Sequence, residues 1–163
     1  MSDVRMNSEE RKALIAELVK RTLPSLVLFA RQWEHDSVDD IVQDAFIRLM
    51  NQSEMPQNPV AWLFTVIRNQ SNNFVRSQKR RKNRESASII ARNSWFQAES
   101  KEQQLIHELE SLPMEYREII VSKIWGKLTF EQIGTMLESS RSSVHRKYNE
   151  GLAILKERLE NHG

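Results

Sequence analysis

Apolar residues recur at helical spacing through most of this chain, and the residues that interrupt helices are scarce. Of 163 residues, only four are Gly and four are Pro. The hydrophobic content of 39% is enough to build a core. Because a stripe of apolar residues at helical spacing marks one buried face of a helix, the pattern predicts an all-α fold.

The pattern divides the chain into two helical halves with a polar segment between them. In the first half we expect helices to begin near Ser8, Ser37 and Pro59, with Pro24 bending or restarting the first helix and a loop at residues 51–59. From Lys82 to Gln104 the periodicity fades, which predicts a linker. The expected organisation is therefore two small helical domains, 1–81 and 105–163, joined by a linker at 82–104. Four linker residues are too apolar for a solvated spacer, and their role is left open: Ile89, Ile90, Trp95 and Phe96.

The second half has the spacing of a helix-turn-helix. Pro113 suits a helix start, Gly126 suits a helix end, and Thr129 with Gln132 forms a capping-box pair that opens the next helix. A turn at residues 138–140 then leads into a last helix, with the small Gly134 facing the turn.

Polar and basic residues gather on the outer face of that last helix. Arg, Asn and His can bond base edges in the major groove, whereas Lys and Ser suit phosphates, so the pattern favours DNA binding over a solvated helical hairpin. Glu138 stands where many such turns carry Gly, so we expect a slightly different turn. The candidate duplex-binding residues are Arg141, Ser142, Ser143, His145, Arg146, Lys147 and Asn149.

Charge is segregated in the first half of the chain, although the net charge is only +2. The segment from Met55 to Arg84 contains no acid, and its basic residues are interleaved with Asn and aromatic residues. Cations can hold phosphates and amides can bond unpaired bases, so this segment suits single-stranded nucleic acid, with a solvated helix face as the alternative. The candidate residues are Arg68, Asn69, Asn72, Asn73, Arg76, Lys79 and Arg80. The loop just before this helix is a place that could shelter an extruded base.

The neighbouring segment, from Arg31 to Arg48, has the opposite charge. It contains five acids and no Lys or Arg between its ends, which suggests a basic protein partner. Plain solvation is one alternative. A carboxylate cluster at Asp40 and Asp44 is another, but no His or second acidic pair is spaced to complete a metal site.

The sequence offers no chemistry of its own. It has no Cys, no glycine-rich phosphate loop and no nucleophile motif, so we expect no enzyme activity, cofactor or metal. The N-terminus carries no signal peptide and no run of 18 apolar residues occurs, which predicts a cytoplasmic protein without a membrane span.

Four segments together resemble the extracytoplasmic-function group of bacterial RNA polymerase sigma factors, over about 140 of the 163 residues. DDIVQDAFIRLM is similar to the core-binding helix of region two, and PVAWLFTVIRNQSNNFVRSQKRR to the helix that reads and opens the minus-ten element. LESLPMEYREIIVSKIWGKLTFEQIGTML is similar to the opening of region four, and SSRSSVHRKYNEGLAILKERL to its recognition helix. The order and separation of the four also agree.

The resemblance implies roles for these segments. The protein would bind core RNA polymerase and promoter DNA and would be a monomer when free; whether an anti-sigma factor restrains it is left open. Asn69 and Asn73 would face the flipped minus-ten base, Trp62 would be a core residue, and the candidate duplex-binding residues would read the minus-thirty-five element. A free-standing helix-turn-helix regulator that binds operators as a dimer is the alternative. The residues that would dock on the polymerase are Asp39, Asp40, Gln43, Asp44 and Arg48.

Overall fold

The structure, a computed structural model, describes residues 6–33, 36–82 and 101–161, with the backbone alone for residues 79–82. These residues form seven α-helices and no strand, which confirms the predicted all-α fold. The chain divides into two compact units, Met1–Arg80 and Arg81–Gly163. None of the described helices is long and apolar enough to cross a membrane. The four apolar residues of the predicted linker, Ile89, Ile90, Trp95 and Phe96, lie outside the described residues.

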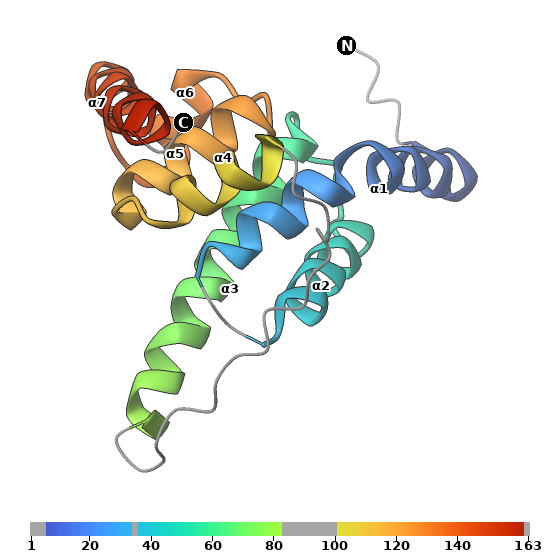
Figure 1. Ribbon diagram of the computed structural model, residues 1–163. Helices are drawn as coiled ribbons and strands as arrows, with labels where there is room; N and C mark the ends of the chain where they lie inside the picture. The colour runs from blue at the N-terminus through green and yellow to red at the C-terminus, as the bar shows by residue number, and fades with distance from the viewer. Residues whose placement is uncertain (1–5, 34–35, 83–100, 162–163) are drawn as a thin grey trace. The chain divides into compact units, whose positions relative to one another are not determined.

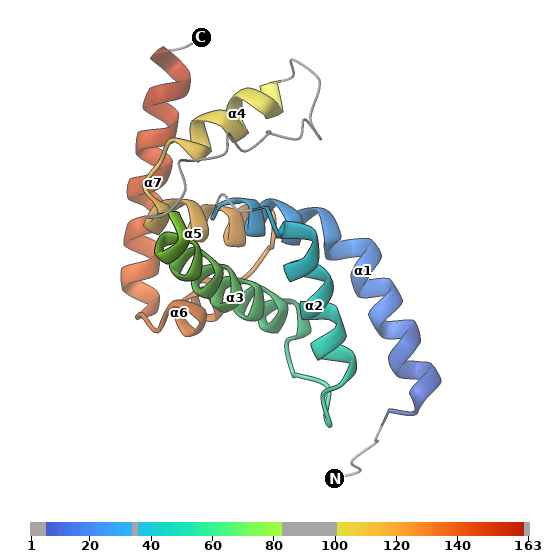
Figure 2. The same ribbon diagram turned by 90° about the horizontal axis from the view of Figure 1, so that it is seen from below.

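The first unit is built from three helices: α1 (Ser8–Arg31), α2 (Val38–Met50) and α3 (Pro59–Lys82). Helices α1 and α2 pack side by side (Figures 1 and 2). Each helix turns one apolar stripe inward, as its sequence periodicity predicts. The fully buried side chains at the centre are Leu18, Leu26 and Phe29 from α1, Leu49 from α2, and Leu63, Phe64 and Ile67 from α3.

An aromatic group joins the end of α1 to α3. The ring of Phe29 lies 4.8 Å from that of Phe64 and 5.0 Å from that of Trp33, measured between centroids. The indole Nε1 of Trp33 donates a 2.7 Å hydrogen bond to Oδ1 of Asn72 on α3. The contact with Trp33 is edge-on and the contact with Phe64 is tilted, and such aromatic contacts stabilise the fold beyond the burial of the rings. The backbone of α3 is thereby held at two points along its length.

The start and course of α1 differ from the expectation. The N-cap is Asn7, not Ser8: its side chain accepts a 2.8 Å bond from the Glu10 backbone N–H, and the Glu10 carboxylate accepts a 3.0 Å bond from the Asn7 N–H. This is a complete capping box. Pro24 neither ends nor restarts the helix, which continues to Arg31. The apolar stripe on both sides of Pro24 packs on the same core, and this burial outweighs the lost backbone hydrogen bond.

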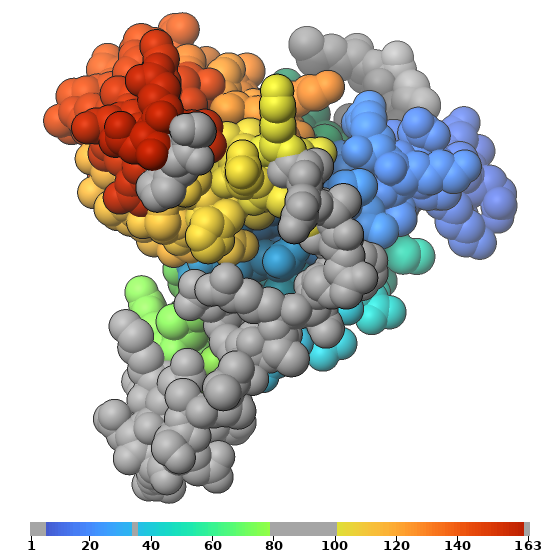
Figure 3. All heavy atoms as spheres, viewed as in Figure 1, coloured from blue at the N-terminus to red at the C-terminus, as the bar shows by residue number. Residues whose placement is uncertain are grey.

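The second unit contains α4 (Lys101–Glu110), α5 (Met114–Ile124), α6 (Phe130–Leu137) and α7 (Arg141–Asn161). Helix α7 packs against all three of the others, and in Figure 3 its red and orange spheres border the yellow spheres of α4. Helix α4 begins at Lys101, inside the segment predicted as a linker. The buried side chains that fill this unit include Leu109, Ile119, Ile120, Ile133 and Val144.

Helix α5 ends at Ile124 with Trp125 as its C-cap, so Gly126 follows the helix end as predicted, but the left-handed residue is the next one. Lys127 has φ 56°, and no described glycine has positive φ. The Leu128 N–H bonds back to the carbonyl of Ser122 at 3.0 Å, which closes the helix end. Thr129 and Gln132 then form the predicted capping box at the start of α6, with bonds of 2.9 and 3.0 Å.

The turn between α6 and α7 is the standard left-handed one, with Glu138 at φ 54° and ψ 43°. The expectation of a different turn is therefore wrong, because Glu138 accepts the left-handed conformation that glycine adopts more readily. Gly134 faces this turn as predicted: a Cβ there would lie 2.7 Å from the backbone oxygen of Ser139. The Ser139 N–H also donates a 2.8 Å bond to the Gly134 carbonyl, so the two segments are in direct backbone contact.

Candidate nucleic-acid and docking interfaces

One face of α3 presents amides and a cation to solvent. Asn69, Asn73 and Arg76 are exposed and lie at intervals of four and three residues, so they share one side of the helix. The other side is fully buried, with Ile67 and Ser71 at 0% exposure. No acid occurs on this helix. The arrangement can hold a phosphate with Arg76 and offer a donor and an acceptor to a base from each Asn.

Other candidates on α3 are placed differently. The amide oxygen of Asn72 is occupied by the Trp33 indole, so Asn72 joins α1 to α3. Arg68 is half-buried. Trp62 is half-buried too, so the prediction that it is a core residue is only partly right. The side chains of Lys79 and Arg80 lie outside the described part of α3.

The outer face of α2 is acidic at its start and apolar at its end. Asp39, Asp40 and Gln43 are exposed, as a docking surface requires. Ile47 and Met50 are also exposed, at 48% and 46%. The sequence analysis did not predict these two as surface residues, although neither belongs to the buried apolar stripe of α2. Large apolar side chains left in solvent beside charged ones are typical of a protein-binding surface.

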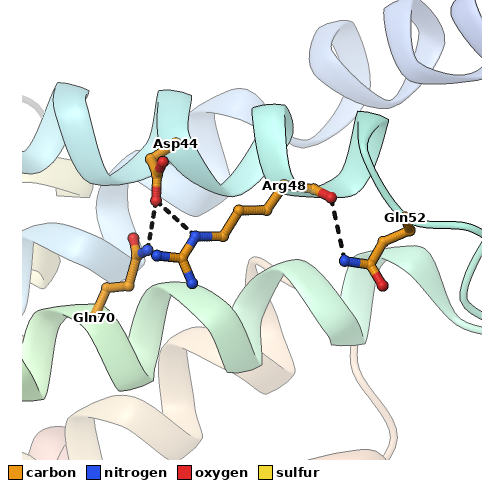
Figure 4. A network of polar contacts seen from close by, with 4 residues as sticks. All are labelled: Asp44, Arg48, Gln52 and Gln70. Atoms are coloured by element: carbon orange, nitrogen blue, oxygen red, sulfur yellow. Dashed lines mark hydrogen bonds and ion pairs between the residues drawn. The ribbon is translucent and has the colours of Figure 1, made fainter.

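Asp44 is held within the first unit. Its Oδ2 accepts a 2.5 Å hydrogen bond from the Gln70 amide on α3 and lies 2.9 Å from Nε of Arg48 on α2, as Figure 4 shows. The Gln70 bond, followed by the Arg48 charge, lowers the pKa of Asp44 below the ordinary value of 3.8. The amide of Gln52 continues the network by donating to the Arg48 carbonyl at 3.3 Å (Figure 4). Asp44 therefore links α2 to α3, Arg48 pairs with it on α2, and the predicted docking roles of both stay predictions.

Helix α7 carries the candidate duplex-binding face. Five of its seven candidates are exposed, and Ser143 and Lys147 are half-buried. Tyr148 packs inward as predicted, with its ring 5.2 Å from that of Phe130. The exposed candidates are Arg141, Ser142, His145, Arg146 and Asn149.

Ion pairs and ring contacts hold several of these side chains in place. Arg146 lies 3.7 Å from the carboxylate of Glu150, and Lys147 lies 3.3 Å from that of Glu115 on α5. The His145 ring meets the edge of Phe130 at 4.9 Å between centroids. Pairs this exposed are weak, so Arg146 can exchange its carboxylate for a phosphate or a base at small cost.

Among the described residues, no group of three or more His, Cys, Asp or Glu side chains could hold a metal ion.

Known proteins are similar to this chain in sequence and in fold. Residues 18–81 match the family model of sigma-70 region 2. RNA polymerase sigma factor SigV of Bacillus subtilis (strain 168) is 22% identical over 127 residues, which cover 76% of this chain and 76% of SigV. The sigma factor RpoE, solved with the anti-sigma factor NepR from Bartonella quintana, matches at TM-score 0.74 and 24% identity, over 91% of this chain and 98% of RpoE. CnrH, solved with the cytosolic domain of CnrY, matches at TM-score 0.64 and 19% identity, over 96% and 94%.

Proposed function

We propose that the chain acts as an RNA polymerase sigma factor similar to the extracytoplasmic-function group, and that its two units divide promoter recognition between them. The first unit docks on core polymerase and reads and opens the minus-ten element. The second unit reads the minus-thirty-five element through α7. The protein carries out no catalytic step itself, and it acts in the cytoplasm, where core polymerase and promoter DNA meet.

The observation that carries this proposal is the shared exposed face of Asn69, Asn73 and Arg76 on α3. The helix beneath it is anchored by side chains that are fully buried, so the face is rigid before DNA arrives. A rigid platform of amides and cations loses little entropy when a single strand binds. We assign Asn69 and Asn73 to the extruded minus-ten base and Arg76 to the backbone of the strand.

The docking assignment rests on α2. The exposed carboxylates of Asp39 and Asp40 can steer a basic partner, and Ile47 and Met50 supply apolar area for a stable contact. We therefore extend the proposed polymerase-docking surface from Asp39, Asp40 and Gln43 to Ile47 and Met50. Asp44 and Arg48 pair with each other on the same helix, and the bond from Gln70 to Asp44 ties this part of α2 to α3.

The assignment of the second unit rests on α6 and α7. The left-handed turn at Glu138 presents the start of α7 outward, with Arg141, Ser142 and His145 exposed there. The start of a recognition helix is the part that enters the major groove in helix-turn-helix proteins. Both solved relatives were captured with a partner protein, one of them an anti-sigma factor, and we propose a partner of that class for this chain also.

The test is reconstitution with core RNA polymerase, followed by transcription from a promoter library. We expect specific initiation that depends on both a minus-ten and a minus-thirty-five sequence. The alternative, a free-standing regulator, predicts tight and sequence-specific binding to duplex DNA by the protein alone and no initiation with core polymerase.

A further inference from the structure

Arg11, near the start of α1, bonds the backbone at the far end of α2. Its Nη1 donates to the carbonyl oxygens of Met50 at 3.3 Å and Gln52 at 2.5 Å, and its Nη2 donates to that of Ser53 at 3.2 Å. Figure 2 shows the first turns of α1 beside the loop that joins α2 to α3. The last carbonyls of a helix have no partner within the helix. One side chain thus supplies donors to the end of α2 and to the first residues of the loop.

Arg11 is itself held in place by the start of α1. The capping box of Asn7 and Glu10 closes the first turn, and the Arg11 N–H donates a 3.0 Å bond to the Asn7 carbonyl. The Arg11 side chain is half-buried. A guanidinium carries its donors in a rigid planar fork, so it can hold several carbonyls in one fixed arrangement. The cap, the helix and the side chain together fix the path of the backbone at residues 50–53.

The loop that Arg11 holds leads directly into the DNA-reading helix. The Trp62 N–H bonds the carbonyl of Asn58, where α3 begins. Most of the loop's polar side chains face solvent, and the loop is where an extruded base could be sheltered. The exposed polar residues of the loop are Asn51, Ser53, Glu54, Gln57 and Asn58.

We propose that Arg11 is a positioning residue for minus-ten recognition. By fixing the backbone at Gln52 and Ser53, it sets the orientation in which the loop offers its polar groups to the extruded base. The inference rests on the proposed function of α3 and its preceding loop. Arg11 does not touch DNA in this scheme, so its contribution reaches the base through the loop alone. A misplacement of about 1 Å in a supporting group is enough to weaken a bound geometry strongly.

The test compares Arg11→Met, which keeps most of the apolar stem, with Arg11→Lys and with Arg21→Met. Arg21 is an exposed residue of the same helix and serves as the matched control. Each variant is reconstituted with core polymerase and assayed on all single-base variants of the minus-ten element. The thermal midpoint of unfolding and the affinity for core polymerase are measured on the same preparations.

We expect Arg11→Met to flatten the preference at one minus-ten position by about fivefold or more, which is within the usual discrimination of one base. Affinity for core polymerase and the minus-thirty-five profile should stay within about twofold of the parent. Arg11→Lys should give an intermediate profile, because an ammonium is a point charge without the planar fork. Arg21→Met should match the parent.

A purely structural role for Arg11 gives a different result. The thermal midpoint would then fall and all promoters would lose activity in proportion, with the minus-ten profile unchanged in shape, and this outcome would overturn the proposal. If Arg11→Met does not fold, the profile of Arg11→Lys decides in the same way. Failure of the proposed function itself is distinguishable, because the parent protein would then initiate at no promoter.

Discussion

The amide of Gln70 on α3 donates a 2.5 Å hydrogen bond to the carboxylate of Asp44 on α2. This bond joins the helix proposed to dock on polymerase to the helix proposed to read the minus-ten element. Arg48 pairs with the same carboxylate oxygen, so the ion pair and the amide bond share one acceptor. The ion pair requires the ionised carboxylate, and both contacts favour that form of Asp44.

The first prediction follows from the lowered pKa of Asp44. A carboxylate whose pKa is lower in the folded state stabilises the fold above its unfolded pKa, and this stability is lost as the pH falls through the folded pKa. Asp44→Asn should therefore lower the thermal midpoint at pH 7, and the difference from the parent should shrink as the pH falls below 3.8. Thermal melts across pH 3 to 7 measure this, and a difference that does not depend on pH would contradict it.

The second prediction concerns the left-handed residue Glu138. A left-handed conformation costs an ordinary residue roughly 1 kcal/mol or more, and glycine far less. Glu138→Gly should therefore raise the free energy of unfolding by up to about 1 kcal/mol. Lys127→Gly is the matched comparison, because Lys127 has nearly the same φ outside the helix-turn-helix. Urea unfolding of the full chain measures both, and a loss of stability in either variant would be against the argument.

The third prediction compares two buried glycines. A Cβ at Gly134 would meet a backbone oxygen at 2.7 Å, whereas a Cβ at Gly151 would meet side-chain atoms only, the Cδ1 of Ile120 at 3.0 Å and the Cβ of Tyr116 at 3.1 Å. Backbone cannot move aside as a side-chain end can. Gly134→Ala should therefore cost about 1–3 kcal/mol of unfolding free energy, and Gly151→Ala should cost less. Equal losses of unfolding free energy for the two variants would contradict this argument, because the backbone of the turn would then adjust as readily as side-chain atoms do.

Most of the fold could be predicted from the sequence, because helical periodicity and caps are local signals. The capping box at Thr129 and Gln132 and the role of Gly134 were visible in the residue pattern alone. The replacement of Ser8 by Asn7 as the cap could not be decided by residue type, since both are good N-caps and only the backbone shows which one flanks the helix. Gly126 follows the end of α5 as predicted, but the left-handed conformation falls on Lys127, where the bond from Leu128 to Ser122 closes the helix end.

Less of the candidate site could be predicted, because its polar contacts join distant parts of the chain. Periodicity identified the polar face of α3, but the partner of Asn72 is Trp33, which lies in the turn just after α1. The sequence places Asp44 in the acidic segment predicted to dock on a partner, but it does not show that Gln70 of α3 bonds its carboxylate. No sequence pattern predicts the role of Arg11, because its partners are backbone carbonyls, which every residue has.

The fourth prediction divides roles between Arg146 and Lys147 on α7. Arg146 is exposed and lies 3.7 Å from the carboxylate of Glu150, an ion pair weak enough for the guanidinium to reorient toward a base edge. Lys147 is half-buried against Glu115 and suits a phosphate. Arg146→Ala should cost about 1–3 kcal/mol and relax one minus-thirty-five position. Lys147→Ala should weaken all sequences alike and reduce the salt dependence of binding by about one ion.

Both α7 variants are measured on a set of single-base minus-thirty-five promoters with reconstituted polymerase. Identical sequence profiles for Arg146→Ala and Lys147→Ala would contradict the proposal that Arg146 reads a base and Lys147 contacts a phosphate. Ala153, an exposed residue on the same helix, offers a control position through Ala153→Ser, which should change neither profile.

The last prediction concerns Asn69 on the exposed face of α3. Taking a base out of the stack costs a few kcal/mol, which the protein must return through contacts with the extruded base. The Asn amide offers both a donor and an acceptor to a base edge, and Ala offers neither. Because Asn69 is exposed, Asn69→Ala should leave folding and polymerase binding nearly unchanged while promoter opening is impaired.

A template with a pre-opened bubble has already met the cost of unpairing, so it should restore much of the activity that Asn69→Ala loses. The control is Asp40→Lys, which reverses an exposed charge on α2 and should weaken polymerase binding on both templates alike. Asp40 serves this purpose better than Asp44, because a change at Asp44 would also break the bond to Gln70. If Asn69→Ala opens duplex promoters as well as the parent does, the extruded base is held elsewhere, and the loop fixed by Arg11 becomes the first place to look.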